Sequence, residues 1–359
     1  MQKQHTRRIN LALQGGGTHG AFTWGVLDRL LEEERIEIEG ISAASAGAMN
    51  ATNLASGFEM GGAPGARAAL DRFWHRMAEM GWYNPIRRSW VEKLRGTWNL
   101  DHHPLALSME QVSVLLSPYQ TNPFNLSQLR MLLDETIDLA PLRAGSAIKL
   151  FVAATNIHTG QPRIFRRHDL TIEALLASSC VPQMFQSVVI DGEAYWDGGY
   201  LGNPPLWPLT LECASPDIMI VQISPMRRDG VPKTAAEITG RLNEIVFNGS
   251  LMTQLGAIST VRQIIFEPDA KGRQIDRLKK KNLFLHRIEA EEAMRTLGAV
   301  SQLNTDLEFL LYLKELGRKA MDRWLRQHFD DLSRCSTFDI DALLQSAGSP
   351  SPLLAWAEE

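Results

Sequence analysis

The feature that most constrains the fold is a glycine-rich turn, Gly15–Gly20, with the sequence Gly-Gly-Gly-Thr-His-Gly. The turn separates a strand candidate, Arg8–Gln14, from a helix candidate, His19–Glu33, whose apolar residues recur at helical spacing. Backbone N–H groups in such a turn, at the start of a helix, form a nest that binds anions. The turn predicts a site for a dinucleotide pyrophosphate or for an oxyanion of acyl transfer, and a glycine-rich turn without a ligand is the alternative.

Strands and helices alternate beyond this turn. Ile36–Ile41 alternates apolar and polar residues as a strand does, and small residues then lead into a helix from Ala46 to about Ala55. Further strand candidates are Ile148–Ala154, Arg163–Phe165, Val188–Ile190, Ala194–Trp196, Asp217–Ile223 and Asn282–Leu285. We therefore expect an α/β fold of three layers, α/β/α, with a mostly parallel central sheet, a helical insertion and a helical C-terminal extension.

Two further motifs carry chemistry. Ala43–Gly47, with the sequence Ala-Ala-Ser-Ala-Gly, follows the second strand and opens a helix, where a nucleophile elbow would expose the hydroxyl of Ser45. Asp197 is followed by Gly198 and Gly199 after a hairpin, and these glycines allow another backbone to come close. The plain alternatives are a helix-capping serine and a turn aspartate. The nest and the elbow would lie at the carboxyl ends of adjacent strands, where open α/β sheets place their sites.

In this order the three motifs resemble the patatin-like lipid acyl hydrolases, which show a G-G-G-x-x-G nest, a G-x-S-x-G elbow and a later D-G-G or D-G-A. The matches are Gly15–Gly20, Ala43–Gly47 and Asp197–Gly199, with looser likenesses at Val152–Asn156 and Ala177–Pro182. The resemblance covers about residues 8–225. It implies hydrolysis of carboxylic esters in acyl lipids through an acyl-enzyme, with no metal and no cofactor.

The resemblance also assigns roles. It implies that Ser45 is the nucleophile and Asp197 the base of a Ser-Asp dyad. It makes Gly15, Gly16, Gly17 and Thr18 the oxyanion hole, supported by His19, Gly20, Ala43, Gly47, Gly198 and Gly199. Two positions depart from the family pattern: Ala43 stands at the first glycine of the elbow, and His19 where the family often has Arg or Lys. A protonated His19 could help to hold the nest, which would make the site pH-dependent.

The resemblance places the catalytic α/β domain at residues 8–225. Residues 57–123 depart from the strand–helix alternation, and we interpret them as a helical insertion that could act as a lid. Residues 226–359 would form a mainly helical region packed on the same domain. The insertion opens with a loop signal, Gly61–Gly65. Four tryptophans follow at a spacing of eight: Trp74, Trp82, Trp90 and Trp98. We interpret them as packing and acyl-pocket residues, and contact with a lipid surface is the alternative.

Other mechanisms use some of the same residues. A dinucleotide-binding protein would need an acidic residue about 20 positions after the turn, and Glu37 or Glu39 could supply it. A Ser-Asp-His triad would recruit His286 or His328. An acyltransferase would use the same acyl-enzyme with an alcohol in place of water, and a scaffold without activity would use none of these residues. The pair His102-His103 lacks a third ligand at metal spacing.

Composition and charge limit which partners and which cellular location we expect for this protein. With 37 Lys+Arg against 41 Asp+Glu, the net charge of −4 argues against nucleic acid. Contact with lipid would then need apolar surface or a local basic patch, such as Lys271–Arg287, which we interpret as a solvated helix end. The apolar stretch Ile9–Leu13 is too short for a signal peptide, and the three cysteines form no disulfide framework. We expect a cytoplasmic protein that acts on acyl lipids, with transient contact at membrane or lipid surfaces, and the oligomeric state stays open.

Overall fold

The computed structural model describes residues 6–81, 88, 96–101, 103, 116–123, 125, 127–266 and 283–346. Its sheet has the order β5-β6-β3-β2-β1-β7-β8, with β4 paired to β3 off this path. The strands are β1 (Arg7–Leu13), β2 (Ile36–Ala43), β3 (Lys149–Asn156), β4 (Pro162–Arg166), β5 (Val188–Ile190), β6 (Glu193–Asp197), β7 (Asp217–Val221) and β8 (Phe284–Ile288). The pairs from β8 through β7, β1 and β2 to β3 are parallel, and β4, β6 and β5 pair antiparallel, so the predicted mostly parallel sheet is confirmed.

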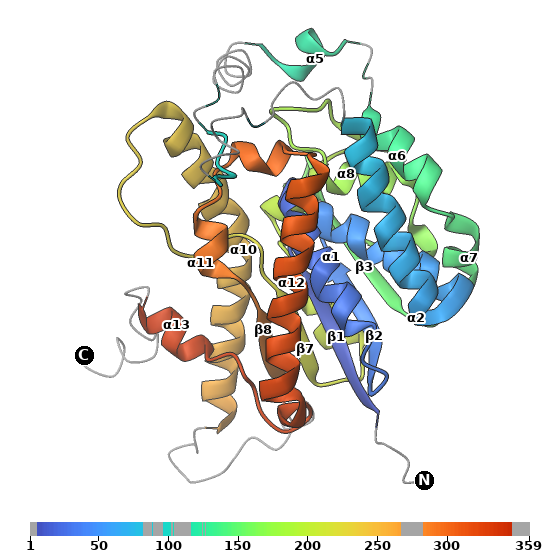
Figure 1. Ribbon diagram of the computed structural model, residues 1–359, viewed down its shortest axis with the longest axis vertical. Helices are drawn as coiled ribbons and strands as arrows, with labels where there is room; N and C mark the ends of the chain where they lie inside the picture. The colour runs from blue at the N-terminus through green and yellow to red at the C-terminus, as the bar shows by residue number, and fades with distance from the viewer. Residues whose placement is uncertain are drawn as a thin grey trace.

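Helices cover both faces of the sheet (Figure 1). The longer ones are α1 (Gly20–Leu30), α2 (Ala46–Met80), α6 (Gln128–Thr136), α8 (Ile172–Ser178), α10 (Ala235–Phe266), α12 (Leu307–His328) and α13 (Ile340–Ser346). The shorter α-helices are α5 (Pro118–Thr121), α7 (Leu139–Ala144), α9 (Trp207–Glu212) and α11 (Glu291–Arg295). The 3-10 helices are η1 (Gly17–His19), η3 (Arg167–Asp169), η4 (Gly198–Tyr200), η5 (Val300–Leu303) and η6 (Phe329–Asp331).

The alternation of side chains along the strands divides the core in two. Leu11 and Leu13 of β1 join α1, α2 and α12 in the larger cluster on one face. Ala12, which points the opposite way, joins α9, α10 and α13 on the other. Side chains that alternate across a strand thus build the predicted three layers from one run of apolar residues.

Helix α2 extends beyond the predicted end at about Ala55. It breaks at Gly61 and Gly62, where Gly62 has a φ of 62°, so the predicted loop is a kink between two helical arms. The second arm buries Trp74, which stacks on Trp24 with ring centroids 6.1 Å apart. Trp74 is therefore a core residue. Trp98 packs beside Phe309, whereas Trp82, Trp90, His102 and Lys271–Lys281 lie outside the described residues.

The β5–β6 hairpin has the predicted turn. Asp191 and Gly192 have φ values of 52° and 83°, as the two central residues of a type I′ turn require. Along β3, β2 pairs up to Val152 and β6 pairs from Ala154 onward, while β4 lies on the opposite edge. Strands β2 and β6 therefore meet end to end on one edge of β3. This arrangement brings together the motif Ala43–Gly47 and the motif Asp197–Gly199.

Candidate active site

Ser45 occupies a strained turn between β2 and α2. Its φ of 52° and ψ of −128° are rare for a residue with a side chain, and such strain is found mainly at functional sites. Its side chain makes no capping hydrogen bond to α2, which argues against the helix-cap alternative. Gly15 and Gly47 lie so close to Ser45 and to the Leu13 carbonyl, respectively, that a Cβ at either position would collide. The elbow therefore needs small residues on both sides.

The sheet brings Asp197 to this turn. The last residue of β2, Ala43, pairs with Val152, and the last residue of β6, Asp197, pairs with Ala154. Two strand residues correspond to about 7 Å, so Asp197 arrives opposite the end of the strand that carries Ser45. The Asp197 N–H donates to the Cys180 carbonyl at 2.8 Å, which fixes the end of β6.

The Asp197 carboxyl is 1% exposed. Burial raises the pKa of Asp197 to about 7, although the Gly199 N–H and the Ser45 hydroxyl favour the ionised form. Gly199 donates to Oδ1 at 2.7 Å, whereas Oδ2 is buried without a hydrogen-bond partner among the described residues. The Ser45 hydroxyl is thus near the carboxyl but outside hydrogen-bond geometry, and catalytic contacts often tighten only with substrate.

The glycine nest lies beside Ser45. The N–H of Gly15 donates to Asn203 Oδ1 at 2.7 Å, so the prediction that Gly15 donates to an oxyanion is corrected. The N–H groups of Gly16, Gly17 and Thr18 have no partner in the described part of the chain. Gly17 is exposed and Gly16 half-buried. Thr18 is buried, so the N–H groups of Gly16 and Gly17 are the more accessible of these three unpaired donors.

His19 is buried and neutral. Desolvation lowers its pKa from 6.5 to about 3, and the positive charge of Arg228 acts in the same direction. Its Nε2 lies 2.7 Å from Ser301 Oγ, and because that hydroxyl donates to the Gly298 carbonyl, His19 must be the donor. A protonated His19 that helps to hold the nest is therefore not found: His19 is a neutral donor to Ser301, beside the nest.

Segment η5 closes over the nest from the far end of the sequence. Thr18 Oγ1 donates to the Ser301 carbonyl at 2.9 Å, and the Gln302 carbonyl lies against Gly17. Asn203 and Ser301 contact the nest, and neither contact was predicted from the sequence. Nothing in the sequence around Asn203 or Ser301 marks either residue.

The acidic residues of the dinucleotide alternative lie at the wrong end of β2. Glu37 and Glu39 belong to its first half, whereas a ribose-binding acid follows the carboxyl end of the strand. Both carboxylate oxygens of Glu39 accept backbone N–H groups, from Ala214 at 2.7 Å and Ser215 at 2.8 Å. The structure thus contradicts this part of the dinucleotide interpretation.

The histidines of the triad alternative are occupied elsewhere. His286 is fully buried and pairs through Nε2 with Asp217 at 3.0 Å, and through Nδ1 with Thr337 at 3.0 Å. Asp217 is the first residue of β7, whereas Ser45 follows the last residue of β2, so the two residues lie at opposite ends of these parallel strands. His328 pairs with Asp331 at 2.8 Å. Neither histidine serves Ser45.

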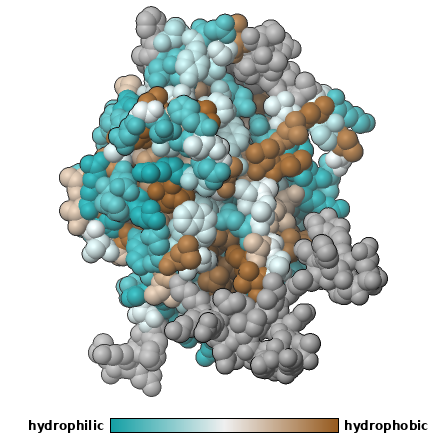
Figure 2. Space-filling model, turned by 180° about the vertical axis from the view of Figure 1, so that it is seen from behind, coloured by the Kyte–Doolittle hydropathy of each residue, from teal (hydrophilic) through white to brown (hydrophobic). Residues whose placement is uncertain are grey.

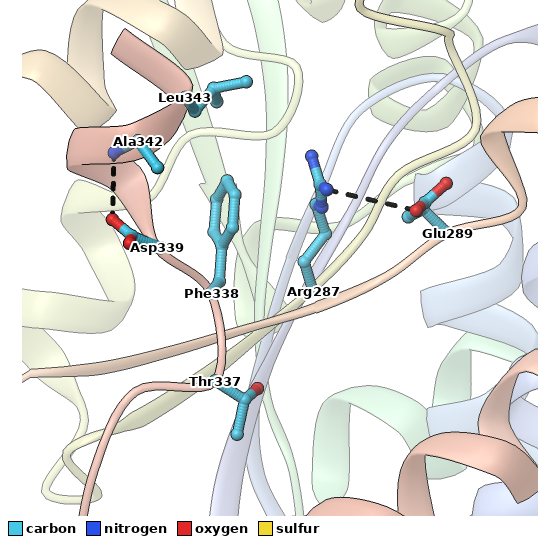
Figure 3. Close-up of a pocket in the computed structure, with 7 residues that line it drawn as sticks. All are labelled: Arg287, Glu289, Thr337, Phe338, Asp339, Ala342 and Leu343. Atoms are coloured by element: carbon cyan, nitrogen blue, oxygen red, sulfur yellow. Dashed lines mark hydrogen bonds and ion pairs between the residues drawn. The ribbon is translucent and has the colours of Figure 1, made fainter. Parts of the chain in front are cut away.

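A separate pocket of about 400 Å³ lies between β8 and the segment that leads into α13 (Figure 3). Arg287 stands over the Phe338 ring there and faces Glu289. None of the predicted site residues lines this pocket. Within the described ranges, no group of three His, Cys, Asp or Glu residues is placed to hold a metal ion. No helix in the same ranges has the length and hydropathy to span a bilayer.

Comparison with known proteins gives one family. A family model described as patatin-like phospholipase matches residues 11–210. No curated protein matches the chain. VipD from Legionella pneumophila is similar with a TM-score of 0.41 and 15% identity, over 89% of this chain and 67% of that one. A chain of the complex of full-length SpcU with full-length ExoU, from the type III secretion system of Pseudomonas aeruginosa, has a TM-score of 0.26 and 16% identity, over 96% and 77%. At these scores the two structures add nothing to the family match.

Proposed function

Because the chain belongs to the patatin-like phospholipase family, we propose that it is a serine hydrolase that cleaves carboxylic esters of phospholipids or related acyl lipids. Membership of the family supports a lipid acyl hydrolase in general terms. One observation carries the finer proposal: a half-buried Ser45 in a strained elbow lies beside the buried carboxyl of Asp197.

The proposed reaction needs only these two side chains and the nest. Ser45 Oγ attacks the ester carbonyl carbon while its proton passes to Asp197 Oδ2, which has no competing partner among the described residues. The N–H groups of Gly16, Gly17 and Thr18 bind the resulting oxyanion. The bond to the alcohol then breaks, the alcohol takes the proton from Asp197, and the acyl group remains on Ser45.

Water releases the acyl group by the same steps. Asp197 accepts a proton as water attacks the acyl carbon, the bond to Ser45 Oγ breaks, and the proton returns to Oγ. An ordinary aspartate, with a pKa of about 3.9, is a poor base near neutral pH. A pKa of about 7 suits Asp197 to both steps, because general catalysis is most effective when the pKa lies near the working pH.

The test is ester hydrolysis by the purified protein with Ser45→Ala and Asp197→Asn. Both changes should lower kcat by about 10³-fold or more, since each removes a member of a unit that acts together. The matched controls are Ser146→Ala, an exposed serine, and Asp191→Asn, a carboxyl in the hairpin turn that precedes β6. A fluorophosphonate should label Ser45 in the wild type and the controls. Turnover like that of the wild type in either site variant would refute the dyad.

Hydrolysis and acyl transfer share the acyl-enzyme. We place hydrolysis first, and products formed with and without an added alcohol distinguish the two. Free fatty acid alone in both reactions supports hydrolysis. A new ester that accumulates with the alcohol supports transfer.

A further inference from the structure

We propose that the N-terminal half of α10 docks the enzyme on a lipid surface through exposed aliphatic side chains. The side chains, which we call the α10 face, are those of Ile238, Leu242, Ile245 and Val246, with exposed fractions of 43%, 57%, 51% and 43%. Figure 2 shows a band of hydrophobic side chains on the upper right of the molecule, where this half of α10 lies. The inference rests on the proposed function, because it assumes a substrate that resides in a lipid surface.

The α10 face is one side of a helix that is already packed on its other side. Its residues recur at i, i+4, i+7 and i+8, the spacing of a single helical stripe. In the second half of the helix, the side opposite to this stripe buries Leu251 and Leu255 in the core cluster that contains Ala12 of β1. Helix α10 thus has two apolar sides, whereas a helix on a soluble surface normally carries polar residues toward water.

Two of the charged residues on this half of α10, Arg241 and Glu244, have ion-pair partners. Glu244 pairs with Arg228 at 2.6 Å and with Arg241 at 3.0 Å. Arg228 in turn donates to the Leu297 carbonyl at 2.9 Å and to the Arg295 carbonyl. Contact of the α10 face with hydrocarbon would therefore not require these charges to leave their partners.

The α10 face adjoins the candidate active site. Val246 belongs to it, and the next residue, Phe247, packs against Gly199 and has its ring centroid 5.0 Å from that of Tyr200. Leu201, which follows, is 38% exposed. Figure 1 shows the start of α10 at the end of the molecule where β1 finishes. Docking here would bring the Asp197 segment near the lipid surface.

A lipid surface fits the α10 face better than a second copy of the chain. Four aliphatic side chains, each about half exposed, amount to less than half of the roughly 800 Å² per partner that a stable protein interface buries. A lipid surface needs only shallow insertion of such side chains. The net charge of −4 gives no attraction to anionic lipid, so binding should depend on apolar contact and resist salt.

The experiment measures flotation of the full chain with phosphatidylcholine vesicles at 0.1 M and 0.5 M NaCl. The test variant is the double change Leu242→Asp with Ile245→Asp. The matched control is Val261→Asp, which changes an exposed residue, 49% accessible, in the other half of the same helix. We expect the wild type and the control to float at both salt concentrations, and the double variant to bind at least ten-fold more weakly with an unchanged circular dichroism spectrum and Tm.

Three results would overturn the proposal: a wild type that stays with the soluble fraction, a double variant that floats like the wild type, or a control that loses binding equally. A dimer in light scattering that the double variant dissociates would assign the α10 face to a second copy instead. Failure of the proposed function is a separate result. Vesicle binding without ester hydrolysis would refute the proposed function and support docking through the α10 face. Hydrolysis of a soluble ester without vesicle binding would refute only the docking proposal.

Discussion

The N–H of Gly15 donates to Oδ1 of Asn203 at 2.7 Å, and both residues are buried. Among the described residues, no other donor hydrogen-bonds to this Oδ1. The backbone N–H of Asn203 donates to Ser250 Oγ at 3.0 Å. The segment that carries Asp197 therefore also holds the first residue of the glycine nest. One stretch of chain thus fixes the position of Asp197, the proposed base, relative to the glycine nest, the proposed oxyanion site.

Asn203→Ala should weaken the nest without touching either reacting group. The Gly15 N–H loses its acceptor, and the adjoining donors lose the anchor that holds them in place. We expect kcat to fall by about ten-fold or more with a smaller change in KM. Asn203→Asp, which keeps an acceptor for Gly15, should recover part of the loss. Equal kcat in Asn203→Ala and the wild type would show that the nest does not depend on this bond.

The rate should rise with pH through the pKa of Asp197. The base must be ionised to accept the Ser45 proton, and burial raises its pKa to about 7. A profile of kcat/KM with a soluble ester should therefore increase up to about pH 7 with a slope of one and then level off. A flat profile between pH 5 and pH 8 would contradict Asp197 as the base.

Asp197→Asn should make the protein more stable at alkaline pH. The folded-state pKa of Asp197 lies above its unfolded value, so the folded protein holds the proton more tightly and loses stability as pH rises from about 4 to 7. The advantage of Asp197→Asn in denaturant unfolding should grow by on the order of 3 kcal/mol between pH 5 and pH 8. Asp191→Asn serves as the exposed control. An advantage that does not change with pH would mean that burial does not raise this pKa.

His19 should act in the opposite direction in acid. Its folded-state pKa of about 3 lies below the ordinary value of 6.5, so its stability contribution is complete above pH 6.5 and declines as pH falls. The wild type should lose about 2 kcal/mol relative to His19→Gln between pH 7 and pH 5. Protonation of Asp197 stabilises the folded protein over the same fall in pH. The effect of each group is therefore measured as the difference in unfolding free energy between the wild type and the variant of that group. A wild type and His19→Gln with parallel pH curves would be the contrary result.

His286 should stabilise the fold without serving the reaction. His286→Ala removes the partner of the buried Asp217 and of Thr337, which should lower the free energy of unfolding by roughly 3 kcal/mol. The kcat per fluorophosphonate-labelled site should stay at the wild-type value. His328→Ala, at a more exposed position, should change both quantities little. Loss of kcat in His286→Ala at full labelling would restore the triad.

The sequence predicted those features of the site that depend only on residues close together in the chain. The turn at Asp191-Gly192 and the small residues around Ser45 have physical requirements that the sequence displays directly. The resemblance to the patatin-like family predicted that Ser45 and Asp197 meet, whereas the strand pairing that brings β2 and β6 together on β3 becomes apparent only in the structure. The strand β8 was also expected, although shifted by two residues at its start.

Contacts between distant segments could not be predicted in the same way. His19 and Ser301 lie 282 positions apart, and no periodicity or motif relates them. The neutral state of His19 depends on burial, which becomes apparent only once η5 is in place. For the same reason, the sequence did not reveal that the Gly15 N–H is taken by Asn203 and not left for an oxyanion.

The closure of η5 over the nest has a consequence for biosynthesis. Ser301 and Gln302 emerge from the ribosome long after the segment that carries Gly17, Ser45 and Asp197. Before η5 has been made, His19 lacks its acceptor, Ser301 Oγ, and Gly17 lacks its contact with the Gln302 carbonyl. A nascent chain that has not yet reached η5 should therefore hold Ser45 and Asp197 but lack a complete nest, which would delay the proposed hydrolysis until η5 has been made.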